Sequence, residues 1–308
     1  MSAAGSFRDP KVLVPFLLVT LIWSSTWIVI KDQIGPVPSP WSVTYRFLIG
    51  AAAMFVIAAA TGARLAIGRE GHVLAALLGT AQFGLNFNFV YAAEHYVTSG
   101  LVAVVFALLM VPNALFARIF FDQRVGRRFL AGSAVALVGV ALLFVQEARA
   151  SAASSAATLT GIGFTLLGVL CASAANVMQL SERVKARPLV ALLAWAMLYG
   201  AILDAAVAFA LYGAPVAEGR IGYWAGLFYL GLIGSALTFP LYFDVIRRIG
   251  PGKAAYSAVL IPILAMAIST VAEGYRWSPL AAAGGMLAIL GLVIALRAGR
   301  PAAETARG

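Results

Sequence analysis

The sequence predicts an all-α membrane protein in which ten transmembrane helices form an inverted 5+5 repeat around a central cavity. Three observations lead to this prediction. Of the 308 residues, 62% are hydrophobic and only 11% are charged, whereas soluble domains carry roughly 25% charged residues. Ten apolar runs are each long enough to cross a hydrocarbon core of about 30 Å as a helix. The first five runs also resemble the last five, which indicates a duplicated unit.

The ten runs follow one another with short connections and show no charged face of the kind a soluble helix carries. The first run is not a cleaved signal peptide, because it continues into Lys31 and Asp32 rather than a small-residue cleavage site. Prolines inside three later runs predict kinks, which are either static or pivots. The predicted spans are residues 12–30, 41–61, 73–92, 97–119, 129–146, 158–180, 188–211, 222–246, 253–272 and 279–297.

Positive charges set the predicted orientation, because Lys and Arg accumulate in cytoplasmic connections. With the N-terminus in the cytoplasm, that side collects seventeen Lys and Arg residues and the other side four. Both termini are then cytoplasmic, as in a multi-pass protein of a bacterial inner membrane. The four on the outer side are Lys31, Arg149, Arg220 and Arg276, and Arg46 is left inside a span.

The two halves match in order along the chain. Leu17–Ser24 aligns with Leu166–Ser173 at an offset of 149, and Ser99-Gly100 aligns with Pro251-Gly252 at an offset of 152. The predicted domains are an N-terminal five-helix repeat at 1–148, a linker at 149–157 and a C-terminal five-helix repeat at 158–308. Because each repeat has an odd number of spans, the second copy lies upside down. Alternating-access carriers use this arrangement, with a substrate site near midplane where the repeats meet.

Short motifs distributed over about residues 10 to 298 carry a family resemblance. They include Leu21–Thr26, Tyr45–Phe47, Tyr91–Ala93, Asp122–Arg124, Val138–Val140, Glu273–Arg276 and Leu290–Leu292. On these residues the chain resembles the drug/metabolite transporter superfamily in its EamA-like ten-helix branch, and within it the YddG-type bacterial aromatic amino acid exporters. The resemblance implies export of amino acids and related metabolites from a central cavity. Asp122 stands where the family usually has Glu, which keeps the charge.

Polar side chains recur at helical spacing in the first, third, sixth and eighth spans. An unpaired polar group costs several kcal/mol in lipid, so these residues should face protein or a water-filled path. We therefore expect these four spans to line the cavity, with spans four and nine closing it. Hydrogen bonding between neighbouring helices, at about 0.6 kcal/mol each, is the alternative interpretation for the hydroxyls. The candidate substrate-binding residues are Trp23, Ser24, Gln82, Asn86, Tyr91, Ser173, Asn176, Gln179, Ser235, Thr238 and Tyr242.

Ionisable residues are rare inside the predicted spans. Arg46 and Asp204 occupy equivalent places in spans two and seven, where each either snorkels to the membrane surface or belongs to a gate or charged pair. Glu94 and His95 fall in a predicted connection, where solvation is expected. The cavity lining is therefore expected to be polar without a fixed charge.

These features favour a secondary transporter that exports aromatic or other apolar amino acids and related small metabolites by alternating access. Aromatic residues would take the ring, while amides and hydroxyls hold the zwitterion. A proton-coupled exporter of cationic drugs is the alternative, and the absence of a carboxylate from the first span ranks it lower. Nucleotide-sugar exchange would favour a midplane cation facing inward, which the sequence does not suggest.

Other classes of protein are weaker interpretations. An enzyme is not expected, since the chain has no H-E-x-x-H or G-x-S-x-G motif. A channel would usually need a charged or carbonyl ring supplied by an oligomer, whereas two complete halves make a monomer sufficient here. No cofactor, metal or nucleic-acid partner is expected. Energy coupling stays open between facilitated diffusion and proton antiport.

Overall fold

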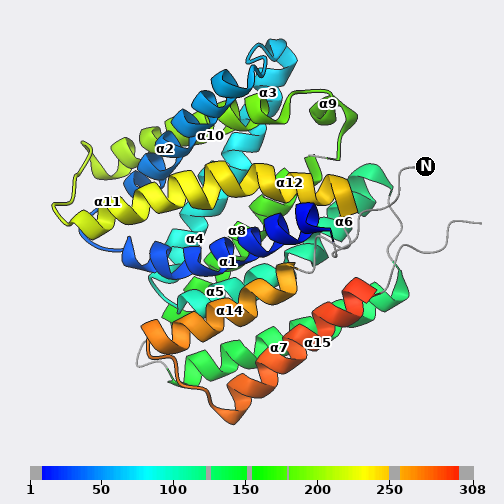
Figure 1. Ribbon diagram of the computed structural model, residues 1–308. Coiled ribbons are helices and arrows are strands. Elements are labelled where there is room, and N and C mark those ends of the chain that lie inside the picture. The colour runs from blue at the N-terminus through cyan, green and yellow to red at the C-terminus, as the bar shows by residue number, and fades with distance from the viewer. Residues whose placement is uncertain (1–8, 123–125, 151–154, 179, 250–256, 298–308) are drawn as a thin grey trace, which may run out of the picture.

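The computed structural model describes residues 9–122, 126–150, 155–178, 180–249 and 257–297. Within these ranges every regular element is helical (Figure 1). The elements are α1 (Pro10–Asp32), α2 (Ser39–Thr61), α3 (Gly68–Leu78), η1 (Gly79–Leu85), α4 (Asn86–Glu94), α5 (Ser99–Phe106), η2 (Ala107–Leu109), α6 (Met110–Phe121), α7 (Arg127–Ala150), α8 (Ser155–Met178), α9 (Glu182–Lys185), α10 (Leu189–Tyr212), α11 (Ile221–Phe228), η3 (Tyr229–Leu237), α12 (Thr238–Ile249), α14 (Ser257–Ala272) and α15 (Pro279–Arg297).

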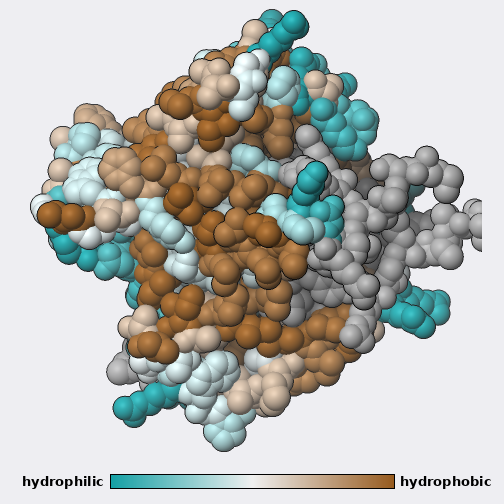
Figure 2. Space-filling view, in the orientation of Figure 1, coloured by the Kyte–Doolittle hydropathy of each residue, from teal (hydrophilic) through white to brown (hydrophobic). Residues whose placement is uncertain are grey.

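Seven continuous helical stretches in the described part of the chain are long and apolar enough to cross a membrane. In Figure 2, hydrophobic side chains cover the middle of the molecule, and hydrophilic ones gather towards the ends of the helices. α7, α14 and α15 occupy the other three predicted spans. The chain is therefore an all-helical membrane protein. The seven stretches are Pro10–Asp32, Ser39–Thr61, Gly68–Glu94, Ser99–Phe121, Ala156–Met178, Leu189–Tyr212 and Ile221–Tyr242.

Local signals fix where the first helices begin and end. The Asp9 side chain caps α1 by accepting a hydrogen bond of 2.9 Å from the backbone of Lys11, and Pro10 occupies the first turn. α2 ends at Gly62, whose φ of 65° is the left-handed conformation that glycine adopts without strain. These caps place the helix ends within a few residues of the ends of the apolar runs.

Two of the long stretches contain a π-helical turn, which the sequence analysis did not predict. η1 separates α3 from α4, and η3 separates α11 from α12. They end at Leu85 and Leu237, which are 152 residues apart, one of the offsets at which the halves align. Both begin near a close backbone approach: a Cβ at Gly79 would lie 2.3 Å from a carbonyl of α10, and one at Gly231 would lie 2.8 Å from a carbonyl of α2. The two halves thus share an irregularity as well as a pattern.

Helix packing relates the halves in the same way. α2 packs along α10, α7 along α15 and α5 against α14, so each of these spans contacts its own counterpart. α1 contacts α12, and α4 contacts α8. Since α1 corresponds to α8 and α4 corresponds to α12 in the predicted repeat, these two contacts are equivalent. Figure 1 shows α2 with α10 at one edge of the bundle and α7 with α15 at the other. Between these two pairs lie α1, α4, α5, α8, α12 and α14.

Candidate functional site: a central cavity

A cavity of about 230 Å³ lies between these helices. Residues of all four spans expected to line it do so, and spans four and nine contribute as well. Ligand pockets commonly measure roughly 300–1,000 Å³, so this cavity suits a small metabolite. The lining residues are Trp23, Thr26, Trp27, Ile30, Arg46, Gln82, Asn86, Phe87, Val90, Ala103, Phe106, Ala107, Leu109, Asn113, Ala172, Asn176, Gly234, Phe239, Tyr242, Ser257, Ile261 and Pro262.

Five of the eleven candidate residues belong to this lining: Trp23, Gln82, Asn86, Asn176 and Tyr242. They come from α1, η1, α4, α8 and α12, which the predicted repeat relates in pairs. The members of the prediction that reach the cavity are thus three of the large amides and two of the three aromatic residues.

Most of the hydroxyls chosen from the sequence are buried but lie outside the lining. They donate instead to carbonyls of their own helices, at 2.6 Å for Ser24 and 2.8 Å for both Ser235 and Thr238. Local bonds of this kind satisfy a hydroxyl without a partner across the cavity. Tyr91 and Ser173 are likewise buried outside the lining, and Gln179 lies outside the described residues.

Aromatic rings form much of the wall. The Trp23 ring centroid lies 5.6 Å from that of Phe239 and 5.0 Å from that of Tyr242. The rings of Trp27 and Phe106 form a second contact at 5.1 Å. Phenylalanines could not be chosen from the sequence, because an apolar ring in an apolar span gives no signal of facing a cavity. Together these rings provide an apolar wall for a ligand.

Arg46 corrects the expectation of a lining without fixed charge. Its side chain is only 2% exposed, and it lines the cavity. Asp204, its counterpart in the other half, is 1% exposed and accepts a hydrogen bond of 2.7 Å from Asn88 Nδ2. The snorkelling interpretation is therefore wrong for both residues. The sequence placed both residues inside apolar spans, but the direction in which each helix faces is set by packing between helices.

Glu94 also departs from its prediction. It is the last residue of α4 and is fully buried, whereas a solvated connection was expected. Lys31 Nζ donates a hydrogen bond to the Glu94 carbonyl oxygen, and neither carboxylate oxygen has a hydrogen-bond partner among the described residues. His95, one residue later, is exposed as expected and shares a hydrogen bond of 3.0 Å with Ser39. The helix thus continues two residues beyond the predicted span and buries the acid.

A polar contact joins the two halves at this same end of the bundle. Glu273, just past α14, accepts a hydrogen bond of 2.6 Å from the Ser99 hydroxyl at the start of α5 and another from Ser269. The Ser99 amide also donates to this carboxylate, at 3.4 Å. Because α5 and α14 are counterparts, this contact crosses the boundary between the repeats. The cavity lining runs from Ile30 and Val90, within about a helical turn of this end, to Tyr242 and Ser257.

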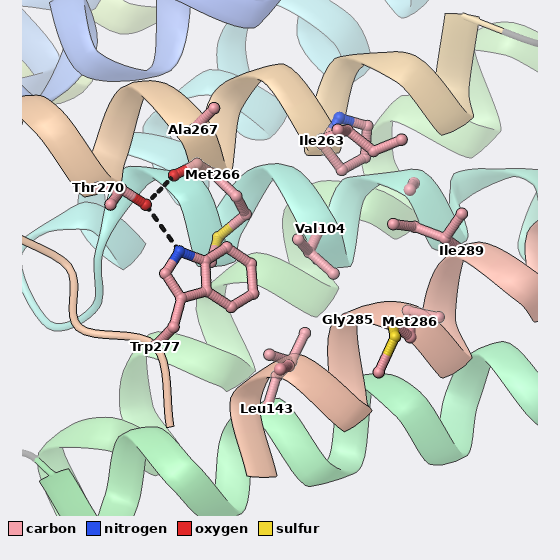
Figure 3. A pocket seen from close by; sticks show the side chains of 14 residues that line it. Val104, Leu143, Ile263, Met266, Ala267, Thr270, Trp277, Gly285, Met286 and Ile289 are labelled. Carbon is pink, nitrogen blue, oxygen red and sulfur yellow. Dashed lines mark hydrogen bonds between the residues drawn. The ribbon is translucent and has the colours of Figure 1, made fainter. Parts of the chain in front are cut away.

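A second cavity, of about 500 Å³, lies at the side of the bundle (Figure 3). Residues of α5, α7, α14 and α15 line it, and nearly all of them are apolar. Met286 is 66% exposed there, and Trp277 donates a hydrogen bond of 2.9 Å to Thr270. In a membrane this surface would face lipid. It offers few polar groups with which to select a solute.

The fold and the central cavity together define a class of protein. An all-helical membrane protein whose two related halves enclose a small aromatic and polar cavity is built as a small-molecule transporter. The described residues contain no group of three His, Cys, Asp or Glu side chains that could hold a metal ion.

Comparison with known proteins identifies the family. The sequence model of the EamA-like transporter family matches the chain twice, at residues 11–145 and 159–297. The chain belongs to this family, which has a duplicated architecture. It is a transporter and not an enzyme.

Several distant relatives match this chain over most of their length. The chain is 24% identical to "Uncharacterized transporter YoaV" of Bacillus subtilis, over 83% of this chain and 86% of that protein. It is 26% identical to a "Probable amino-acid metabolite efflux pump" of Salmonella typhimurium, with 90% and 92% covered. It is 25% identical to a "Probable terminal-alkyne amino-acid exporter" of Streptantibioticus cattleyicolor, with 92% and 93% covered. A crystal structure with 20% identity matches with a TM-score of 0.68, over 92% of this chain and 96% of that one, and supports the fold.

Proposed function

We propose that this chain is a secondary transporter that exports aromatic or other apolar amino acids and related small metabolites across a bacterial inner membrane by alternating access. The observation that carries the proposal is the central cavity, where aromatic rings and the amides of Gln82, Asn86 and Asn176 meet. The rings suit an apolar side chain, and the amides suit an amino acid's polar end. Two distant relatives, named as a probable amino-acid exporter and a probable amino-acid metabolite efflux pump, support the same substrate class. A likeness to YddG-type exporters is part of this proposal.

The proposed architecture is ten spans in an inverted 5+5 repeat, with repeats at 1–148 and 158–308 and a linker at 149–157. The shared position of the π-helical turns and the pairing of counterpart helices support it. Both termini are placed in the cytoplasm by the distribution of Lys and Arg. Each complete chain contains both halves, so a monomer suffices for transport.

The contacts around the cavity suggest which state of the cycle this is. Glu273 and Ser99 join the halves at the predicted outer end, close to Ile30 and Val90 of the lining, and at the other end the lining reaches Tyr242 and Ser257. In the proposed cycle this contact closes the outer side when substrate enters from the cytoplasm, and it breaks for release.

Counterflow in proteoliposomes tests the proposal. Purified protein is reconstituted with unlabelled phenylalanine inside, and uptake of radiolabelled phenylalanine is followed. Saturable, accelerated exchange is expected, with competition by other apolar amino acids. The absence of exchange for every amino acid in the panel would overturn the substrate class, and uptake that never saturates would indicate a channel.

Export of cationic drugs is disfavoured by the same cavity. Its described lining contains the cation Arg46 and no Asp or Glu. A cationic ligand would be repelled by the guanidinium without a carboxylate to bind it.

A further inference from the structure

The guanidinium of Arg46 is held in the cavity wall by aromatic rings. Its central carbon lies 4.2 Å from the ring centroid of Phe87 and 5.2 Å from that of Phe47. Nη2 makes one long hydrogen bond, of 3.4 Å, to the Ser235 hydroxyl. Gly234 lies beside this nitrogen, since a Cβ there would be in ordinary contact with Nη2 at 3.9 Å. Cation–π contacts of this kind contribute about 2 kcal/mol when desolvated, but they leave the N–H groups without acceptors.

The charge of Arg46 is not matched by an acid at bonding distance. No ion pair to Arg46 within 4.0 Å occurs among the described residues, although Glu94 lies close enough to influence it electrostatically and the Tyr91 hydroxyl lies close enough to act as a weak hydrogen-bond partner. Nε and Nη1 donate no hydrogen bond of normal geometry, and Trp27 Nε1, which shares the cavity lining, has no acceptor either. A buried cation without a partner costs several kcal/mol. A ligand that brings an anionic oxygen would recover that cost.

Unmatched acceptors lie in the same lining. Asn86 Nδ2 donates a hydrogen bond of 3.2 Å to the Gln82 carbonyl oxygen, whereas Asn86 Oδ1 accepts no hydrogen bond. Asn113 Oδ1 is buried without a donor too. An ammonium group has three donors and no acceptor. Residues of the lining therefore carry buried groups without hydrogen-bond partners, namely an arginine fork, an indole N–H and two amide oxygens, whose chemistry complements a carboxylate and an ammonium.

We propose that Arg46 is the carboxylate-binding residue of the cavity, and that Trp27, Asn86 and Asn113 complete a site for a zwitterionic α-amino acid. This inference rests on the proposed function, in that the cavity is taken as the transport site. The planar guanidinium pairs with a carboxylate through two parallel hydrogen bonds, which an ammonium cannot replace. The neighbouring rings of Trp23 and Phe239 receive the side chain. A nucleotide sugar also carries anionic oxygens, but it does not fit a cavity of about 230 Å³.

Three probes with one phenyl ring separate the contributions. L-Phenylalanine carries both charged groups, 3-phenylpropionate only the carboxylate, and phenethylamine only the ammonium. Competition for the counterflow signal, or binding by thermal shift where no counterflow is seen, is measured for each. Wild-type protein should prefer phenylalanine, then phenylpropionate, and bind phenethylamine least. Equal binding of phenethylamine and phenylalanine in the wild type would overturn the proposal without any variant.

The Arg46→Gln variant tests the residue itself. A hydrogen bond to a charged group contributes about 1.5–3 kcal/mol, so affinity for both carboxylates should fall about 10- to 150-fold, with no loss for phenethylamine. Arg46→Lys keeps the charge without the fork and should give an intermediate affinity. The matched control is Arg64→Gln, because Arg64 is exposed in the turn beyond the other end of α2. It should leave all three affinities unchanged.

The two proposals fail in different ways. Phenylalanine exchange that is equal in the wild type and Arg46→Gln would overturn the carboxylate site and leave amino acid export standing. Carboxylate binding that depends on Arg46, without exchange of any amino acid, would overturn the export proposal and retain the site. No binding of any of the three probes would overturn the carboxylate site, and together with no exchange across the amino acid panel it would overturn both.

Discussion

Replacing Ser99 by alanine should open the outer side of the cavity more often. The Ser99 hydroxyl donates to Glu273 Oε2 at 2.6 Å, across the boundary between the halves. Hydrogen bonds to a charged group contribute about 1.5–3 kcal/mol. If the contact exists only in the closed state, losing it shifts the equilibrium by this amount. Since 1.4 kcal/mol is about a factor of ten, the open fraction should rise about 10- to 150-fold.

Cysteine labelling measures this shift. Val90 lines the cavity and lies one helical turn before Glu94, so it should be reached from outside only when the outer contact opens. In a Cys171→Ala background, which removes the single native cysteine, Val90→Cys is labelled with a membrane-impermeant maleimide added to the outside of intact cells. Labelling should be slow with Ser99 present and faster with Ser99→Ala in proportion to the open fraction.

A local hydroxyl provides the control. Ser133 donates at 2.8 Å to the carbonyl of Phe129 within α7, so it joins no second helix. Ser133→Ala should leave the labelling rate of Val90→Cys unchanged. A Ser99→Ala rate equal to that of Ser133→Ala would refute the reasoning, because the contact would then carry no preference between the states.

Three further predictions concern packing and charge. Asn88→Leu removes the hydrogen bond to the buried carboxyl group of Asp204 and should lower the free energy of unfolding by about 0.5–1.5 kcal/mol for a neutral carboxyl group and about 1.5–3 kcal/mol for a charged one. An equal loss in an Asp204→Asn background would show that a charge on Asp204 contributes nothing. Gly139→Leu should destabilise the pair formed by α7 and α15 by about 1–3 kcal/mol or more, since a Cβ at Gly139 would lie 2.2 Å from a backbone nitrogen of α15; an unchanged melting temperature contradicts this. Partial burial is the larger cause that lowers the pKa of His95, and the positive charge of Lys31 is the smaller one. The unfolded chain therefore binds the proton more readily, and stability should fall as pH drops below about 6.5. His95→Asn should flatten that decline in melting temperature, and an identical decline in the variant excludes His95 as its source.

Hydropathy located the helices closely because in a membrane the length of a span and the cost of a charge are both set by the bilayer. α10 and α15, for example, begin within one residue of the apolar runs that predict them. The amides of Gln82, Asn86 and Asn176 could be chosen because a large polar group in an apolar helix must face protein or water. These parts of the fold and site depend on one helix at a time.

The remaining features depend on contacts between helices. The π-helical turns accompany a close approach of Gly79 to α10 and of Gly231 to α2, which no single span specifies. Asn113 was not among the candidate residues because it lies on a span that was expected only to close the cavity. The burial of Glu94 follows from α4 continuing past the apolar run and packing beside Lys31. Sequence periodicity shows that a residue is polar, but not what the next helix presents to it.

Arg46 and Asp204 show how two related halves can form a site that binds a substrate in one orientation. Both lie at the same level of counterpart helices, and both are buried. Asp204 is held by Asn88 and lies outside the cavity lining, whereas Arg46 lies against Phe87 within it. Two acids or two arginines would give each half an equivalent charge, and a substrate could then bind in two equivalent orientations. With the free cation on one side only, a carboxylate has one place to bind, so the divergence of this pair is sufficient to orient a zwitterion between otherwise related halves.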